Sequence, residues 1–301
     1  MTGAHHDHAA IDHNRAFAVG VALNVLFVAV EAVFGILAGS LALLADAGHN
    51  LSDVLSLLLA WGASYLARRP PTHRRTYGLR RSTILASLLN AVILLVAVGA
   101  IGWEAVRRLG DPAPVASGTM MAVAGVGVAV NTATALLFAS GRHHDLNLKG
   151  AYLHMAADAA ISAGVVAAGL AIWLTQATWI DPALSLVIVL AIAIGTWGLF
   201  RDSVNLALDA VPAGIDPQGI RAWLRELDGV VAVHDLHIWA MSTTETALTA
   251  HLVMPEAASG DEFLCRVARE LRDRFHIAHA TIQIERGDMA HPCQLASDDH
   301  V

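Results

Sequence analysis

The stretch that decides the fold is residues 39–67, GSLALLADAGHNLSDVLSLLLAWGASYLA. From Leu41 onward it is apolar and long enough to cross a bilayer, which takes about 20 residues per helix. Its first half nevertheless contains His49 and, four residues later, Asp53. Residues four apart lie on one face of a helix, so the sequence predicts an imidazole and a carboxylate side by side at membrane depth.

Apolar stretches of similar length lie on both sides of this one. Gly39 and Ser40 alone separate it from the preceding stretch, which predicts a tight antiparallel hairpin. The chain is 55% hydrophobic and only 15% charged, more apolar than a soluble core can bury. We therefore expect an α-helical membrane protein with six transmembrane helices, at 17–38, 41–67, 84–106, 117–138, 148–174 and 182–200.

The distribution of basic residues predicts the orientation of these helices. With the N-terminus inside, the outer loops contain only Arg107 and Arg108. Basic residues collect in cytoplasmic loops, so we expect a multi-pass membrane protein with both termini in the cytoplasm. The inner loop between the second and third helices contains Arg68, Arg69, Arg74, Arg75, Arg80 and Arg81.

After Val211 and Pro212 the pattern becomes that of a soluble domain. Helical and strand-like periodicities follow in the order α-β-β-α-β, which predicts a cytoplasmic α+β domain with one sheet covered by two helices. The expected division is a flexible His-containing tail (1–14), a six-helix transmembrane domain (15–205), the cytoplasmic domain (206–288) and a flexible C-terminal tail (289–301).

Charge and cysteine content exclude other classes of protein. Residues 206–301 contain 15 acidic and 7 basic groups, and a nucleic-acid-binding surface needs the opposite balance. Cys265 and Cys293 are too few for a disulfide framework.

A second His and Asp pair repeats the first one. Only His49 and His154 among the 16 histidines fall within a spanning stretch, and Asp158 follows His154 at the same spacing as Asp53 follows His49. Two such faces supply two nitrogens and two oxygens, a set that suits Zn²⁺. Alternatively, each pair is a structural hydrogen bond between helices; the repeated spacing and the cost of ionisable groups in a membrane favour a metal transport site.

Other polar residues lie near these ligands in the predicted helices. Asp46 and Asn50 flank His49 and are candidates for a second layer that orients the ligands. Glu31 and Ser162 are open to either that role or plain interhelical hydrogen bonding.

The charges of this site indicate what it exchanges. Two ionised Asp residues are neutralised either by one divalent cation or by two imidazolium rings, and imidazole titrates near neutral pH. We therefore expect exchange of one divalent cation, such as Zn²⁺, for protons, with no catalytic residue and no cofactor other than the metal.

The cytoplasmic domain contains further candidate ligands. His234 and His237 are three apart in one strand and so point to opposite faces unless a bulge intervenes. Cys293 is a further candidate soft ligand. The set that could converge across the sheet is His234, His251, His279 and Glu285, although strand histidines are more often structural.

Three motifs resemble the cation diffusion facilitator family: residues 39–53, residues 145–158, and the strands at 233–239 and 279–285. The resemblance implies a homodimeric antiporter of the bacterial plasma (inner) membrane that exports Zn²⁺, or Cd²⁺ or Co²⁺, in exchange for protons, with a ferredoxin-like cytoplasmic domain. It assigns the transport site to His49, Asp53, His154 and Asp158, and His at the first position is associated with zinc and cadmium. It also implies that metal bound in the cytoplasmic domain tightens the dimer. The loop after the second helix departs from some relatives, because only His73 remains of their second ion site.

Two functions of other classes use the same ligands. An intramembrane metalloenzyme needs an open coordination position and a general base, and the sequence has no His-Glu-Xaa-Xaa-His run. A metal sensor that signals through the cytoplasmic domain predicts no flux. We expect a transporter that works by alternating access, with divalent metal ions, protons, the lipid bilayer and a second copy of the chain as its partners, and no nucleic acid.

Overall fold

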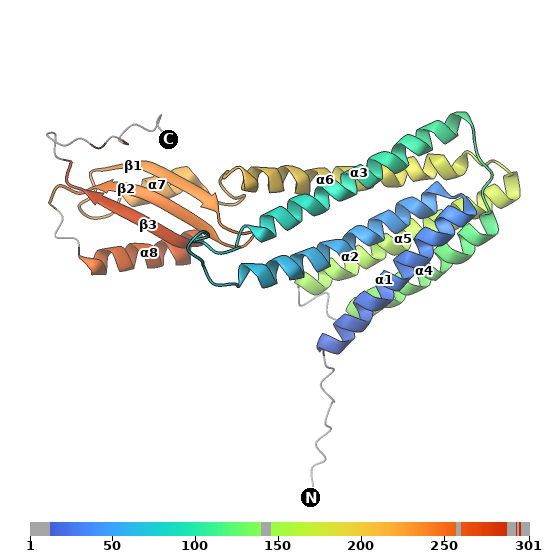
Figure 1. Cartoon of the computed structure of the whole chain (residues 1–301), viewed down its shortest axis with the longest axis horizontal. Helices are drawn as coiled ribbons and strands as arrows, with labels where there is room; N and C mark the ends of the chain where they lie inside the picture. The colour runs from blue at the N-terminus through green and yellow to red at the C-terminus, as the bar shows by residue number, and fades with distance from the viewer. Residues whose placement is uncertain (1–12, 140–145, 257–259, 288–292, 294, 296–301) are drawn as a thin grey trace, which may run out of the picture. The chain divides into compact units, whose positions relative to one another are not determined.

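The structure is a computed structural model that describes residues 13–139, 146–256, 260–287, 293 and 295 (Figure 1). His5, His6, His8 and most of the predicted C-terminal tail lie outside the described residues, as do His143, His144 and His291.

The helices predicted for the membrane domain are confirmed. Each begins and ends within a few residues of the prediction, apart from α6, which continues seven residues beyond 200 to Ala207. They are α1 (His13–Ala38), α2 (Leu41–Ala67), α3 (Ser82–Gly110), α4 (Ser117–Ala139), α5 (Leu146–Thr175) and α6 (Ile180–Ala207).

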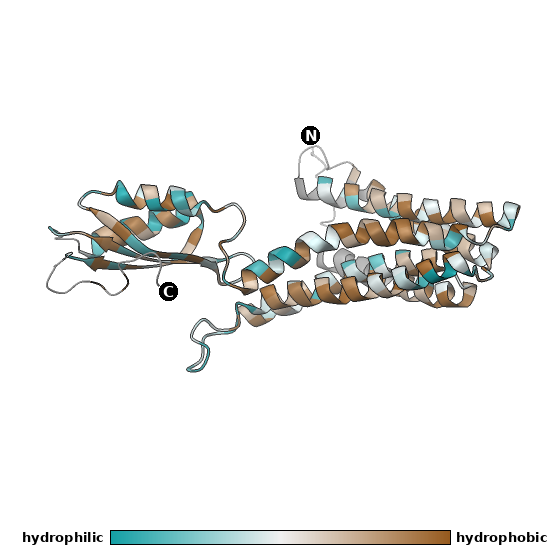
Figure 2. Ribbon diagram, turned by 90° about the horizontal axis from the view of Figure 1, so that it is seen from above, coloured by the Kyte–Doolittle hydropathy of each residue, from teal (hydrophilic) through white to brown (hydrophobic). Residues whose placement is uncertain are grey.

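Hydropathy distinguishes these helices from one another. Among the described residues, 4 segments are long and apolar enough to cross a membrane by length and composition, and they lie in α3, α4, α5 and α6 (Figure 2). In α1 the segment Val25–Ala38 is apolar but shorter than these four. α2 has 27 residues, a sufficient length, but it is not among these 4 segments. α2 contains two of the four candidate ligands, His49 and Asp53, and α5 contains the other two.

The chain forms two compact units, Met1–Leu58 with Asn90–Trp197, and Leu59–Leu89 with Gly198–Val301. The first has a core of interlocking apolar side chains that includes Leu43, Met120 and Val165, all completely buried. Gly39 adopts a positive φ of 67° in the two-residue connection between α1 and α2, as glycine does readily.

A buried carboxylate closes the start of α2. Asp181, at the beginning of α6, accepts hydrogen bonds from Ser40 Oγ at 2.5 Å, from Leu41 N at 2.7 Å and from Ala42 N at 3.2 Å. These are backbone and side-chain donors at a helix N-terminus, where a negative charge is stabilised. Asp181 is fully buried, so this contact ties α6 to the α1–α2 hairpin.

The second unit contains the α-β-β-α-β domain. Its elements are α7 (Pro217–Arg225), β1 (Ala232–Ala240), β2 (Thr246–Val253), α8 (Asp261–Phe275) and β3 (Ile277–Glu285). The strand order is β1-β2-β3, with β2 antiparallel to β1 and parallel to β3. Asp216 caps α7 and Pro217 begins it, as predicted.

Both helices of this domain pack on one face of the sheet. Leu224 of α7 and Leu271 of α8 belong to the same buried cluster as Leu248 and Leu252 of β2 (Figure 1). His251 alternates with these residues along β2, so its side chain lies on the opposite face. The face that the two helices leave uncovered is therefore the one that carries the histidine.

Candidate metal sites

The four candidate membrane ligands lie together between α2 and α5, and their pairing is crossed. His49 Nε2 of α2 lies 3.2 Å from Asp158 Oδ1 of α5. His154 Nε2 of α5 lies 3.2 Å from Asp53 Oδ2 of α2 and 3.7 Å from Asp158 Oδ2. Each histidine is thus closest to the aspartate of the other helix.

The shortest distances in the cluster match the spacing of two ligand atoms around a tetrahedral metal ion, and His154 lies outside the group of three whose ligand atoms all come within 4.8 Å of one another. Two ligand atoms that are each about 2.0 Å from one Zn²⁺ stand about 3.3 Å apart. The closest contacts in the cluster are 3.2 Å, and one atom from each of His49, Asp53 and Asp158 falls within 4.8 Å of the others. The donor set of imidazole nitrogens and carboxylate oxygens is one that zinc accepts.

The cluster is open at one end and closed at the other. The side chains of His154 and Asp53 are 43% and 36% exposed, His49 is 22% exposed, and Asp158 only 2%. Asp158 lies farther along α5 than His154 and toward the buried end. Asp158 is thus the most buried of the four candidate ligands.

The two predicted support residues contact other partners than the ligands. Asp46 accepts a hydrogen bond from Ser162 Oγ at 2.8 Å, and Asn50 Nδ2 donates to Glu31 Oε2 at 3.0 Å. Both pairs are buried. They form a layer next to the ligands that joins α1, α2 and α5.

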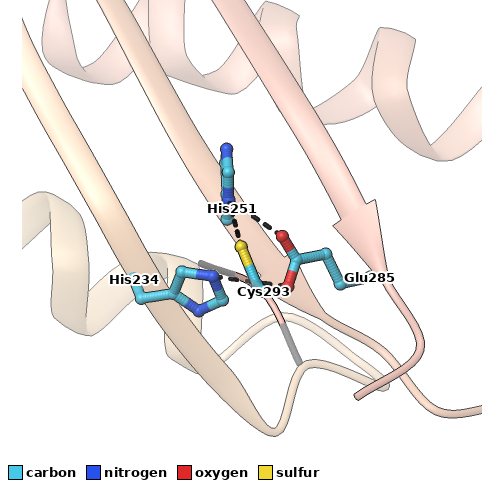
Figure 3. Close-up of side chains that lie close together, drawn as sticks. All are labelled: His234, His251, Glu285 and Cys293. Atoms are coloured by element: carbon cyan, nitrogen blue, oxygen red, sulfur yellow. Dashed lines mark hydrogen bonds and ion pairs between the residues drawn. The ribbon is translucent and has the colours of Figure 1, made fainter. Parts of the chain in front are cut away.

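A second cluster lies on the uncovered face of the sheet (Figure 3). His234 and His251 are direct partners across β1 and β2, and Glu285 ends β3. Glu285 lies 2.9 Å from His251 Nδ1 and 3.3 Å from His234 Nε2 through its two oxygens. These three predicted residues therefore come together.

The fourth member of this cluster is Cys293 rather than His279. Cys293 Sγ lies 3.7 Å from His251 Nδ1, and ligand atoms of all four residues lie within 4.8 Å of one another (Figure 3). The ring of His279 instead packs edge-on against Tyr77, with ring centroids 5.8 Å apart. The sequence favoured His279 because it adjoins a strand; the only signal for Cys293 was the chemistry of its thiol.

A β-bulge separates His234 from His237. The register shifts between these residues, and Asp235 has a positive φ of 51°. Its carboxylate lies 2.9 Å from His237 Nε2 and 3.4 Å from His251 Nε2. Asp235 therefore connects His237 to His251 of the cluster, a role that periodicity alone did not indicate.

The cytoplasmic cluster has features that suit a cation. Burial raises the pKa of Glu285, but the Cys293 hydrogen bond and the His234 and His251 rings outweigh it, so its pKa lies below the ordinary value. A backbone hydrogen bond at Leu295 lowers the pKa of the Cys293 thiol, yet Glu285 and burial outweigh it and the net shift is upward. His234 Nε2 is buried without a well-aligned hydrogen bond among the described residues. A nitrogen in that position is free to coordinate a metal.

Comparison with known families covers both parts of the chain. Residues 17–206 match the model of the cation efflux transmembrane domain, and residues 212–287 match the model of the cytoplasmic domain of cation efflux proteins.

Individual relatives match over most of their length. The cation efflux system protein CzcD of Alcaligenes sp. is 36% identical over 295 residues, 98% of this chain and 92% of the relative. The zinc transporter ZitB of Escherichia coli is 40% identical over 271 residues, 89% of this chain and 86% of the relative. A cadmium, cobalt and zinc/H⁺-K⁺ antiporter of Bacillus velezensis is 33% identical over 288 residues, 94% and 92% of the two chains.

Among solved structures, the metal-bound C-terminal domain of the CzcD transporter from Cupriavidus metallidurans is 35% identical. The match covers 24% of this chain and 99% of that chain, with a TM-score of 0.22.

Proposed function

This chain belongs to the cation diffusion facilitator family of bacterial zinc, cadmium and cobalt transporters, and from that premise we propose that it exports Zn²⁺ from the cytoplasm in exchange for protons by alternating access. It is a multi-pass inner-membrane transporter of metal cations rather than an enzyme. The observation that carries the proposal is the crossed cluster of His49, Asp53, His154 and Asp158 between α2 and α5.

The donor set and the names of the relatives support zinc as the cargo. Two imidazoles and two carboxylates form a ligand set of intermediate softness that suits Zn²⁺ and does not exclude Cd²⁺ or Co²⁺. One of the relatives is named a zinc transporter and another a cadmium, cobalt and zinc antiporter.

Charge neutrality supports exchange for protons. With Asp53 and Asp158 ionised, the cluster is neutral when it holds one divalent ion or when both histidines are protonated. Left empty and deprotonated, it would place two negative charges in a partly buried site, which costs free energy. Metal binding therefore displaces protons from His49 and His154, and protons returning to them displace metal.

The orientation and the assembly follow from other features. The excess of basic residues on one set of loops supports cytoplasmic termini. Residues 212–287 match the cytoplasmic domain of cation efflux proteins, so we place this domain in the cytoplasm and pair it with a second copy of the chain.

The cytoplasmic cluster is proposed as a regulatory metal site. His234, His251, Glu285 and Cys293 would hold one ion, with Cys293 taking the place expected for His279. These residues come from all three strands and from the segment after β3, so a bound ion would link those parts of the domain. The ion would supply the positive charge, and the four side chains would hold it in place.

The test is zinc uptake into proteoliposomes under an imposed pH gradient. We expect proton-coupled flux in the wild type and its loss in His49→Ala and Asp158→Ala. Flux that ignores the pH gradient would contradict proton exchange. Zinc binding without any flux in the wild type would contradict the transporter assignment and favour a metal sensor.

A further inference from the structure

A layer of polar side chains lies beside the membrane metal site and is not part of it. Glu31 comes from α1, Asp46 and Asn50 from α2, and Ser162 from α5. Glu31, Asp46 and Ser162 are completely buried and Asn50 is 7% exposed. Two carboxyl groups at this depth need an explanation, because a buried carboxylate without sufficient donors is costly.

The hydrogen bonds of this layer satisfy only half of its carboxyl oxygens. Asn50 donates to Glu31 Oε2 and Ser162 donates to Asp46 Oδ2. The remaining oxygens, Glu31 Oε1 and Asp46 Oδ1, are buried and have no donor among the described residues. The two carboxyl groups are within hydrogen-bonding contact of each other.

Two carboxylates cannot hydrogen-bond to each other, because both groups only accept. A single proton removes the conflict: one group becomes a carboxylic acid whose O–H donates to the other. The shared proton also removes the repulsion between two like charges, since only one carboxyl group of such a pair ionises.

Asp181 shows the contrasting case in the same membrane domain. It is equally buried, but its oxygens accept three hydrogen bonds, from Ser40, Leu41 and Ala42. Its donors satisfy the ionised form, whereas Glu31 and Asp46 have one donor each.

We propose that Glu31 and Asp46 together form a second proton-binding site, which holds one shared proton and is linked to the metal site. This inference rests on the proposed function, since it adds a proton site to the exchange. The link is electrostatic: Asp46 lies on α2 three residues before His49, about one turn away.

The charged groups that face the pair come from the metal site. His49 on the same helix and Asp158 on α5 act on Asp46 through their charges. α4, which packs on α1, contains no ionisable residue. An empty, deprotonated metal site adds negative charge that favours protons on the pair, and Zn²⁺ cancels this charge. Zinc binding therefore weakens proton binding by the pair, and by reciprocity a proton on the pair weakens zinc binding.

The test is infrared spectroscopy of the purified full-length protein at neutral pH, which detects the carbonyl stretch of a protonated carboxylic acid. We expect this band in the wild type and its loss in Glu31→Gln and in Asp46→Asn. Either amide can donate N–H to the remaining carboxylate, so each variant keeps the contact without the proton. Asp181→Asn is the matched control and should retain the band.

Zinc titration then tests the link. Zinc should reduce or shift the band in the wild type, and it should leave the band unchanged in His49→Ala. Absence of the band in the wild type, or its persistence in both amide variants, would overturn the proton site. A band indifferent to zinc would overturn the link. Because the band is read without transport, a wild type that shows the band but no zinc flux would contradict only the proposed function.

Discussion

His49 Nε2 on α2 lies 3.2 Å from Asp158 Oδ1 on the neighbouring helix α5. Asp53, four residues from His49, lies instead 3.2 Å from His154. Neither helix can hold the ligands in this arrangement alone. Any movement of α5 relative to α2 changes the distances of both pairs at once, so it would bind or release the ion as one event.

Asp158→Asn tests the most buried of the four ligands. The amide keeps the shape but removes the charge that would balance Zn²⁺, so we expect the initial rate of zinc uptake to fall by more than about 100-fold, beyond the effect of outer-layer changes. Asp202→Asn removes a carboxylate that pairs with Arg201 and is 58% exposed, and it should leave uptake near the wild-type rate. Comparable rates in both variants would exclude Asp158 as a ligand.

Asp181→Ala should destabilise the membrane domain. It removes the acceptor of three hydrogen bonds and leaves Ser40 and the first N–H groups of α2 unpaired in a buried place. We expect the free energy of unfolding to fall by about 2 to 4 kcal/mol. Thermal denaturation of the protein in detergent measures this change. Asp216→Ala removes an exposed cap of α7 and should cost about 1 kcal/mol. Equal losses would mean that the tie between α2 and α6 contributes nothing beyond an ordinary cap.

The composition of the cytoplasmic site is tested by comparing Cys293→Ser with His279→Ala. Cys293 shares the cluster with His251, whereas His279 packs against Tyr77. Calorimetry on the full-length protein should therefore show zinc binding weakened at least about 10-fold by Cys293→Ser and unchanged by His279→Ala. The opposite ranking would restore His279 to the ligand set.

Zinc binding at this site should weaken as the pH falls. The pKa of the Cys293 thiol is raised, so the thiol is protonated at neutral pH and must lose its proton to bind metal. The pKa of Glu285 is lowered, so its carboxylate is already ionised and releases nothing in this range. Calorimetry in two buffers of different ionisation enthalpy should count about one proton fewer per zinc ion in Cys293→Ser. An unchanged count would show that the thiol does not coordinate.

Much of the architecture could be predicted because it depends on local patterns. The apolar stretches place α1 to α6, and the alternation of apolar and polar residues places β1 and β2. The spacing of His49 and Asp53 placed both on one face of α2. Spacing within a helix says nothing about the neighbouring helix, so the partner of each histidine could not be predicted.

The cytoplasmic cluster shows where sequence reasoning ends. β3 runs parallel to β2, so His279 pairs with Ala247 near the start of β2, while His251 lies near its end. Strand direction is a tertiary property, and it separates His279 from the cluster. The bulge at Asp235 is likewise set by pairing and not by composition.

Cys293 reaches the cluster from beyond the last strand, eight residues after Glu285. A chain shortened at Gly287 would retain α7, α8 and all three strands, and it would fold around the same sheet. It would also lack one of the four ligand atoms. Shortened versions of the domain would then differ from the full chain in metal preference, toward harder ions, because the soft sulfur is lost. The metal preference of this domain therefore depends on whether the chain extends as far as Cys293.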